Sequence, residues 1–117
     1  NENSLVMLVT TGGYTYLFTV DIPSNVEEAL YKKYGEIDVD VLKVAHHGSG
    51  YSSSVTFFQM VHPRIAMIGV GEHNLYGHPA RIVIKRLEER KIKILRTDLD
   101  GSFSIITYLG EHLIYRY

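Results

Sequence analysis

Two adjacent histidines, His46 and His47, stand where a hydrophobic segment ends and a glycine follows. Valines and leucines within 39–44 predict a strand that is buried on at least one face. Gly48 and the serines after it predict the end of that strand. Imidazoles at the carboxyl end of a strand face the crevice in which open α/β sheets place their chemistry, and histidine is a common metal ligand. A bare pair of histidines is nevertheless more often one packed and one solvated side chain, so the neighbouring sequence decides between these interpretations.

Three further polar groups follow predicted strands in the same way: Asp21, His78 and the segment 96–98. If the strands are parallel neighbours, all four junctions open on one edge of a sheet. One carboxylate with two or three imidazoles, in a chain without cysteine, suits zinc, manganese or iron. Each group also has a structural interpretation, because Asp21 could cap the next helix, His78 could bond loop backbone and Asp98 fits a turn. Their joint placement predicts a metal site. We interpret the other histidines as surface or outward-facing residues: His62, His73 and His112.

Hydrophobic periodicity predicts the elements that would position these residues. The expected strands cover residues 4–10, 14–20, 39–45, 65–70, 91–96, 103–108 and 112–115. The expected helices cover residues 24–34, 52–61 and 80–90. Strands that alternate with helices in the middle of the chain indicate α/β layers. Helices on one face only would leave the other face of the sheet bare, which predicts a covering layer or a homodimer. That bare face would include Leu5, Met7, Tyr16, Phe18 and Met67.

Length and composition limit the class of protein. With 117 residues, of which 45% are hydrophobic, the chain is one domain or part of one. The formal net charge of −1 provides no general basic field for nucleic acid. No apolar run reaches the roughly 18 residues that would span a bilayer, and no signal peptide opens the sequence. The compartment is therefore not indicated by the sequence.

Several blocks of the sequence together carry a family resemblance. They are residues 40–49 (DVLKVAHHGS), 74–79 (NLYGHP), 96–98 (RTD) and the strand 17–21 (LFTVD). Their order and spacing resemble the second half of the metallo-β-lactamase-type domain of the ComEC competence proteins and their stand-alone relatives. The resemblance extends from Asn3 to about Ile106.

The resemblance implies a fold and a site. Residues 1–117 would be a single domain or a fragment with an α/β fold: half of an αββα sandwich, whose mixed sheet carries helices on one face. Asp21 matches a carboxylate that bridges two divalent metal ions, zinc or manganese, and either His46 or His47 matches a further metal ligand. The strand register slightly favours His46. His78 matches a catalytic histidine near the scissile phosphate of a phosphodiester, where two metal ions would stabilise the attacking and leaving oxygens.

The implied function is the C-terminal portion of a phosphodiesterase or nuclease linked to DNA uptake. ComEC itself is a membrane channel. The resemblance alone therefore implies that the chain acts on DNA and is part of a membrane-anchored protein.

Two departures from the family pattern limit this expectation. The His-x-His-x-Asp-His motif of the family's first half does not occur in the sequence, and Val20 stands where the pattern Thr-Gly-Asp has glycine. We therefore expect the chain to be inactive alone and to require the missing N-terminal half as its partner. The alternative is a degenerate, non-catalytic half-domain that serves assembly or DNA binding.

Overall fold

A five-stranded mixed sheet forms the middle layer of the computed structural model, which describes residues 3–117. The strands lie side by side in the order β1 (Met7–Thr11), β2 (Tyr14–Phe18), β3 (Val41–Lys43), β4 (Ile65–Ile68) and β5 (Lys93–Arg96). β1 and β2 form an antiparallel hairpin, whereas β2 to β5 are all parallel. The carboxyl ends of four neighbouring strands therefore open on one edge of the sheet, as the sequence predicted.

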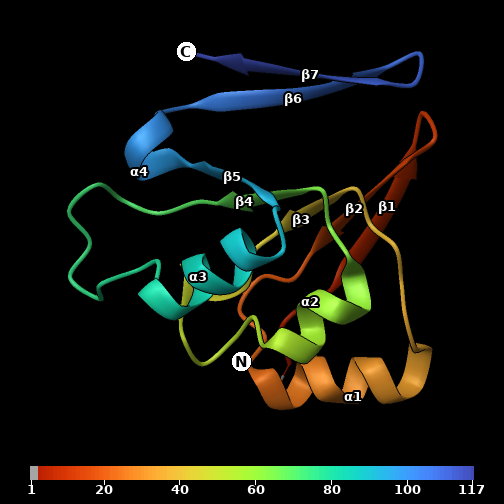
Figure 1. Cartoon of the computed structure of the whole chain (residues 1–117), viewed down its shortest axis with the longest axis vertical. Helices are drawn as coiled ribbons and strands as arrows, with labels where there is room; N and C mark the ends of the chain where they lie inside the picture. The colour runs from red at the N-terminus through yellow and green to blue at the C-terminus, as the bar shows by residue number, and fades with distance from the viewer. Residues whose placement is uncertain (1–2) are drawn as a thin grey trace.

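Three helices cover one face of this sheet (Figure 1). They are α1 (Ser24–Tyr34), α2 (Val55–Val61) and α3 (Arg81–Glu89). α3 buries Val83 and Leu87, which are four residues apart and so lie on the same side of the helix. These side chains join Leu42, Phe57 and Phe58 in the main core. Full burial of each such side chain stabilises the fold by roughly 1.5–3 kcal/mol.

A second hairpin covers the other face of the sheet (Figure 1). The short helix α4 (Thr97–Asp100) leads into β6 (Phe103–Tyr108), which pairs with β7 (Glu111–Arg116). The hairpin side chains Phe103, Ile105 and Ile114 pack against the buried sheet residues Val41, Ile65 and Leu95. The expectation of a bare second face is therefore wrong where the hairpin lies. The predicted face residues Tyr16 and Met67 are half-buried beneath it.

His112 corrects a second expectation, because it does not face outward. Its ring packs on that of Tyr14 at a centroid distance of 3.8 Å, and its Nδ1 lies 3.3 Å from the Thr107 hydroxyl. Thr107 and His112 are direct cross-strand partners, so their side chains share one face of the hairpin. That face is the one turned toward the sheet, where the Tyr16 hydroxyl also bonds Thr107.

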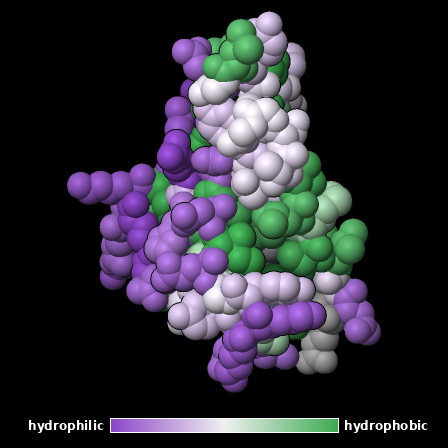
Figure 2. Space-filling model, turned by 90° about the vertical axis from the view of Figure 1, so that its right-hand side faces the viewer, coloured by the Kyte–Doolittle hydropathy of each residue, from purple (hydrophilic) through white to green (hydrophobic). Residues whose placement is uncertain are grey.

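An apolar patch lies on one side of the molecule, between more hydrophilic regions (Figure 2). β1 is an edge strand of the sheet, and the exposed residues of β1 and its approach include Leu5, Met7 and Leu8. An apolar pocket of about 300 Å³ lies between β1 and α1. The expectation of exposed apolar surface is therefore confirmed at Leu5 and Met7. No helix among residues 3–117 is both long and apolar enough to cross a bilayer.

Candidate functional site

The two adjacent histidines lie on a tight turn directly after β3. The chain leaves the strand after Lys43 and forms a tight turn over Ala45–Gly48 in place of the predicted strand end. His46 and His47 have φ angles of 49° and 54°. This left-handed conformation costs a residue with a side chain about 1–2 kcal/mol. Backbone strain of this kind collects at functional sites, where the surrounding structure holds it.

A second strained residue stands beside this turn. Val20 has a φ of 37°, and its carbonyl accepts a hydrogen bond of 2.8 Å from the His46 backbone N–H. The position thus keeps a left-handed backbone although its residue is a valine and not the glycine of the resembled pattern. The next residue, Asp21, is half-buried. Its carboxylate is close enough to Lys43 to oppose the lowering of the Lys43 pKa by burial.

The side chains of His46 and His47 diverge. The His46 ring lies edge-on to the His78 ring, with a centroid distance of 5.8 Å. The exposed His47 ring donates from Nδ1 to the carbonyl of Gly69, which follows β4. His46 therefore lies between the Asp21 turn and His78, whereas His47 is bonded to the adjacent strand end. Both imidazoles are nevertheless near enough to His78 to lower the pKa of its ring.

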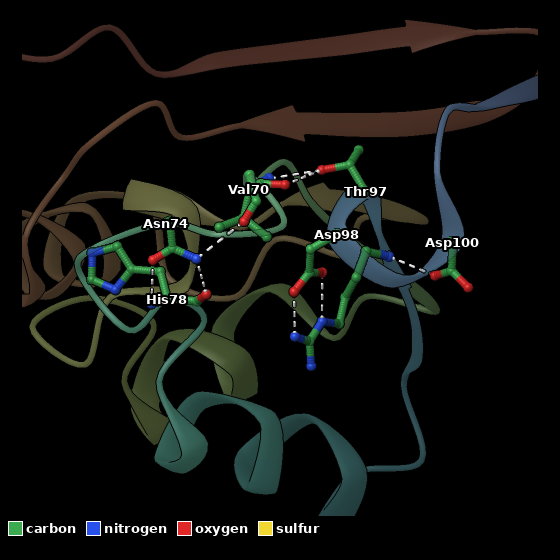
Figure 3. Close-up of polar contacts among 8 residues, drawn as sticks. Val70, Asn74, His78, Thr97, Asp98 and Asp100 are labelled. Atoms are coloured by element: carbon green, nitrogen blue, oxygen red, sulfur yellow. Dashed lines mark hydrogen bonds and ion pairs between the residues drawn. The ribbon is translucent and has the colours of Figure 1, made fainter.

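An asparagine fixes the loop that carries His78 (Figure 3). The Asn74 amide donates to the carbonyls of Gly71 at 3.2 Å and His78 at 2.7 Å, and its oxygen accepts the His78 N–H at 2.8 Å. Burial lowers the pKa of His78, and the neighbouring imidazoles of His46 and His47 lower it further. His78 is therefore a neutral imidazole near pH 7, held in place by one side chain of its own loop.

Gly48 brings the two histidine segments into contact. Its carbonyl accepts a hydrogen bond of 2.8 Å from the Ala80 N–H. A Cβ at position 48 would lie 2.5 Å from Cβ of Pro79 and 3.0 Å from Cα of that residue. Gly48 also has a φ of +85°. Only glycine combines this backbone conformation with so close an approach.

A pocket of about 470 Å³ opens between these strand ends and the 69–79 loop. Its polar lining comprises Lys43, His47, Asn74, Tyr76, His78 and Thr97. Lys43 lies along Gly69, with its Cε 3.5 Å from the place that a Gly69 Cβ would take, and donates from Nζ to the Val44 carbonyl at 2.9 Å. The lining thus contains one ammonium and two imidazole rings, whose N–H groups are hydrogen-bond donors.

The 96–98 segment lines the pocket through Thr97 and adds no carboxylate to it. Asp98 accepts from Arg96 Nε at 3.0 Å and Nη2 at 2.6 Å (Figure 3). These hydrogen bonds lower the pKa of Asp98. The Thr97 hydroxyl donates to the Val70 carbonyl at 2.8 Å and accepts the Val70 N–H at 2.7 Å. Thr97 thereby ties the end of β4 to that of β5.

The predicted metal ligands do not form a complete site among residues 3–117. No group of three or more His, Asp or Glu side chains in this part of the chain is placed to hold a metal ion. Asp21, His46 and His47 carry donor atoms of the right chemistry, but His47 Nδ1 is bonded to the Gly69 carbonyl, and the His46 ring lies edge-on to that of His78. These residues alone therefore do not fit a metal centre, and no catalytic step follows from one here.

Sequence reasoning missed three residues of the pocket: Lys43, Asn74 and Tyr76. Lys43 was detectable as the one charged residue in the otherwise apolar run 41–45. Asn74 was detectable as a side chain that closes turns, located four residues before His78. Tyr76 carried no signal of its own, because its exposure depends on the path of the loop.

Comparison with known proteins gives relatives that are much longer than this chain. It is 42% identical over 103 residues to competence protein ComA of Neisseria gonorrhoeae and 38% identical over 102 residues to ComE operon protein 3 of Bacillus subtilis. Both alignments cover 87% of this chain, but only 15% and 13% of those proteins. Recombination protein 2 of Haemophilus influenzae is 33% identical over 105 residues, or 13% of its length. No protein-family model matches the chain. The relatives support the resemblance to competence proteins, and the chain spans about 13–15% of the length of the first two.

Proposed function

We propose that this chain is the C-terminal portion of a phosphodiester hydrolase, a phosphodiesterase or nuclease, within a longer protein of bacterial competence and DNA uptake. The relatives support the competence context. The observation that carries the hydrolase proposal is the meeting of the Asp21 turn, the His46 turn and the His78 loop at the carboxyl edge of the parallel strands. This edge is where open α/β sheets bind ligands.

In this proposal the chain supplies part of the chemistry. Lys43 and His78 line the pocket, where they would orient a phosphate, while Asp21 lies close to Lys43 and His46 lies close to His78. The divalent metal, zinc or manganese, would be bound only in the longer protein, where ligands from outside this chain join these donors. The 117 residues alone are then inactive.

Phosphodiester cleavage by the longer protein tests the proposal. We expect Asp21→Ala, and separately His46→Ala, to lower the rate at least about 100-fold, since each would remove a donor where charge develops. His73→Ala is the matched control, because His73 is an exposed histidine that does not line the pocket. Full cleavage by the Asp21 and His46 variants would contradict the hydrolase proposal.

A second candidate is a non-catalytic module for assembly or DNA binding. The incomplete donor set and the exposed apolar side at Leu5, Met7 and Leu8 favour it. In the longer protein that side would pack on the preceding half of the domain. In isolation it would pair with a second copy, because an edge strand with exposed apolar residues is a template for association.

Light scattering should then report a homodimer at micromolar concentration, and Leu8→Lys should give a monomer. A wild-type monomer would exclude this pairing.

A further inference from the structure

The tip of the 69–79 loop exposes two large side chains that the fold does not use. Leu75 is 98% exposed and Tyr76 is 83% exposed. The backbone beneath them is nevertheless fixed, since the Asn74 side chain bonds both Gly71 and His78. The Tyr76 ring lies nearly parallel to that of His78, with an interplanar angle of 19° and a centroid distance of 5.9 Å. An aromatic face is thus held open to solvent on a fixed loop.

The same ring borders the pocket that contains Lys43. The Lys43 ammonium uses one of its three donors on the Val44 carbonyl, which leaves two for a ligand. Burial lowers the pKa of Lys43 and the nearby Asp21 carboxylate opposes that lowering, but the carboxylate also offsets part of the attraction of the ammonium for an anion. The net charge of the chain is −1, so no general field attracts a polyanion. Binding must depend on local contacts.

We propose that Tyr76 is a platform on which one base of a single-stranded nucleic acid stacks, while Lys43 holds a phosphate of the same strand in the adjoining pocket. The volume of about 470 Å³ is in the range of small-molecule sites, and so admits a phosphate with its sugar. Bases in a duplex are stacked on one another and unavailable to Tyr76, whereas aromatic side chains bind exposed bases of any sequence. This inference rests on the proposed function, for which it names the residues that select the substrate.

The absence of tryptophan from the sequence gives a direct test. In Tyr76→Trp the new indole is the only one, and a base that stacks on it should quench its fluorescence. We expect saturable quenching by a single-stranded oligodeoxynucleotide and at least fivefold weaker binding of an abasic strand with the same number of phosphates. Tyr51→Trp is the matched control, because Tyr51 is 85% exposed and lies outside the pocket, and its emission should not change. Equal quenching by the abasic strand, or none by either strand, would overturn stacking.

Affinity measurements on unlabelled variants separate the two contacts. With a fluorescent single strand, Tyr76→Ala should weaken binding at least fivefold and Tyr76→Phe should restore it, because only the aromatic face is needed. Lys43→Met should weaken binding and reduce its dependence on salt by about one ion. Unchanged affinity in Tyr76→Ala would overturn the proposal.

The outcomes also separate this inference from the hydrolase proposal. Cleavage by the longer protein that depends on Asp21, without quenching in Tyr76→Trp, would overturn stacking and leave the hydrolase in place. Quenching by the single strand without any cleavage would support stacking and identify a binding module. Preference for duplex over single strand in Tyr76→Trp would contradict the stacking platform.

Discussion

The loops that follow β3 and β4 lie at the same edge of the sheet but are held in place by different contacts. In the loop after the histidine turn, Ser52 and Ser53 are buried, and the Ser52 hydroxyl donates to the Ile22 carbonyl at 2.7 Å. The buried Glu27 carboxylate accepts the backbone N–H groups of Ser53 and Ser54, and Arg86 donates to the Ser53 carbonyl at 3.0 Å. That loop is fixed from outside by α1 and α3.

In the loop after β4, Thr97 and His47 bond the start at Val70 and Gly69, whereas the exposed tip is fixed from within by Asn74. The histidine turn is thus followed by a loop that is packed into the core, whereas His78 lies on a loop that is held mainly at the surface. The serine loop is part of the core, so its disturbance should lower the free energy of unfolding. The Asn74 loop is a local device, so its failure should disturb the site while the fold survives. The following predictions test this distinction, in order of decreasing effect on stability.

Gly48→Ala should have the largest effect, since it pushes the two loops apart. The substitution places a Cβ 2.5 Å from Pro79 Cβ in a backbone with a φ of +85°. Backbone strain of about 1 kcal/mol and overpacking of about 1–3 kcal/mol together predict a loss of roughly 2–4 kcal/mol in the free energy of unfolding. Urea denaturation measures this loss.

Gly13→Ala is the matched control for that measurement. Gly13 has a φ of +81°, but a Cβ there would meet no atom within 4 Å. The expected loss is only the backbone part, about 1 kcal/mol. Equal losses in the two variants would show that the close approach of Gly48 and Pro79 contributes nothing.

Glu27→Gln should destabilise the serine loop in a pH-dependent way. Burial raises the pKa of the Glu27 carboxyl, although the Ser54 and Ser53 N–H groups oppose this. The folded state therefore holds this proton at higher pH than the unfolded chain, and the stability that the proton gives is lost as pH rises through the raised folded pKa. At pH 4 we expect the variant to be less stable by about 1 kcal/mol, from one lost hydrogen bond.

That deficit should shrink as the pH rises toward 7, because the wild-type protein then bears a buried charge and the variant does not. Asp98 is present in both proteins, so its contribution cancels when the free energy of unfolding of the variant is subtracted from that of the wild type. Its lowered pKa gives the opposite slope, a stability lost as pH falls. Urea unfolding at several pH values measures the difference, and a deficit that grows with pH would contradict the assignment.

Asn74→Ala should have the smallest effect on stability and a large effect on the site. The loop is at the surface, so its disorder would expose little of the core. The free energy of unfolding should therefore fall by no more than about 1 kcal/mol. Affinity for a single-stranded oligodeoxynucleotide should nevertheless fall severalfold, because Tyr76 and His78 lose their fixed backbone. Asn74→Asp, which keeps the acceptor for the His78 N–H, should be intermediate. If the alanine variant keeps its affinity, Asn74 does not position Tyr76 and His78 for binding.

The order and type of the elements could be predicted from the sequence because their signals are local. Alternation and glycine pairs located β1 and β2, and the apolar stripe located α3. The tight turn Ala45–Gly48 and the short helix α4 were missed, since four residues are too few to show a periodic pattern. The covering hairpin was predicted as a hairpin, but its docking on the sheet depends on contacts between distant segments, such as Ile105 with the sheet cluster of Val41, Ile65 and Leu95.

The site was predictable only at its strand ends. Parallel strands bring the Asp21, His46 and His78 segments to one edge, and this follows from chain order and strand direction. The divergence of His46 from His47 does not follow from the sequence, because it arises from two left-handed residues that a strand register cannot represent. Likewise, Asp98 was separated from the site by its pairing with Arg96.

The central claim is that the pocket at the carboxyl edge binds a phosphate-bearing single strand. Amide chemical shifts of the ¹⁵N-labelled chain, followed during titration with a single-stranded oligodeoxynucleotide, test it most directly. We predict saturable shifts in residues 43–48, 69–78 and 97, with β1 and the β6–β7 hairpin unchanged. Shifts confined to the apolar side around β1, or no shifts at all, would contradict the claim.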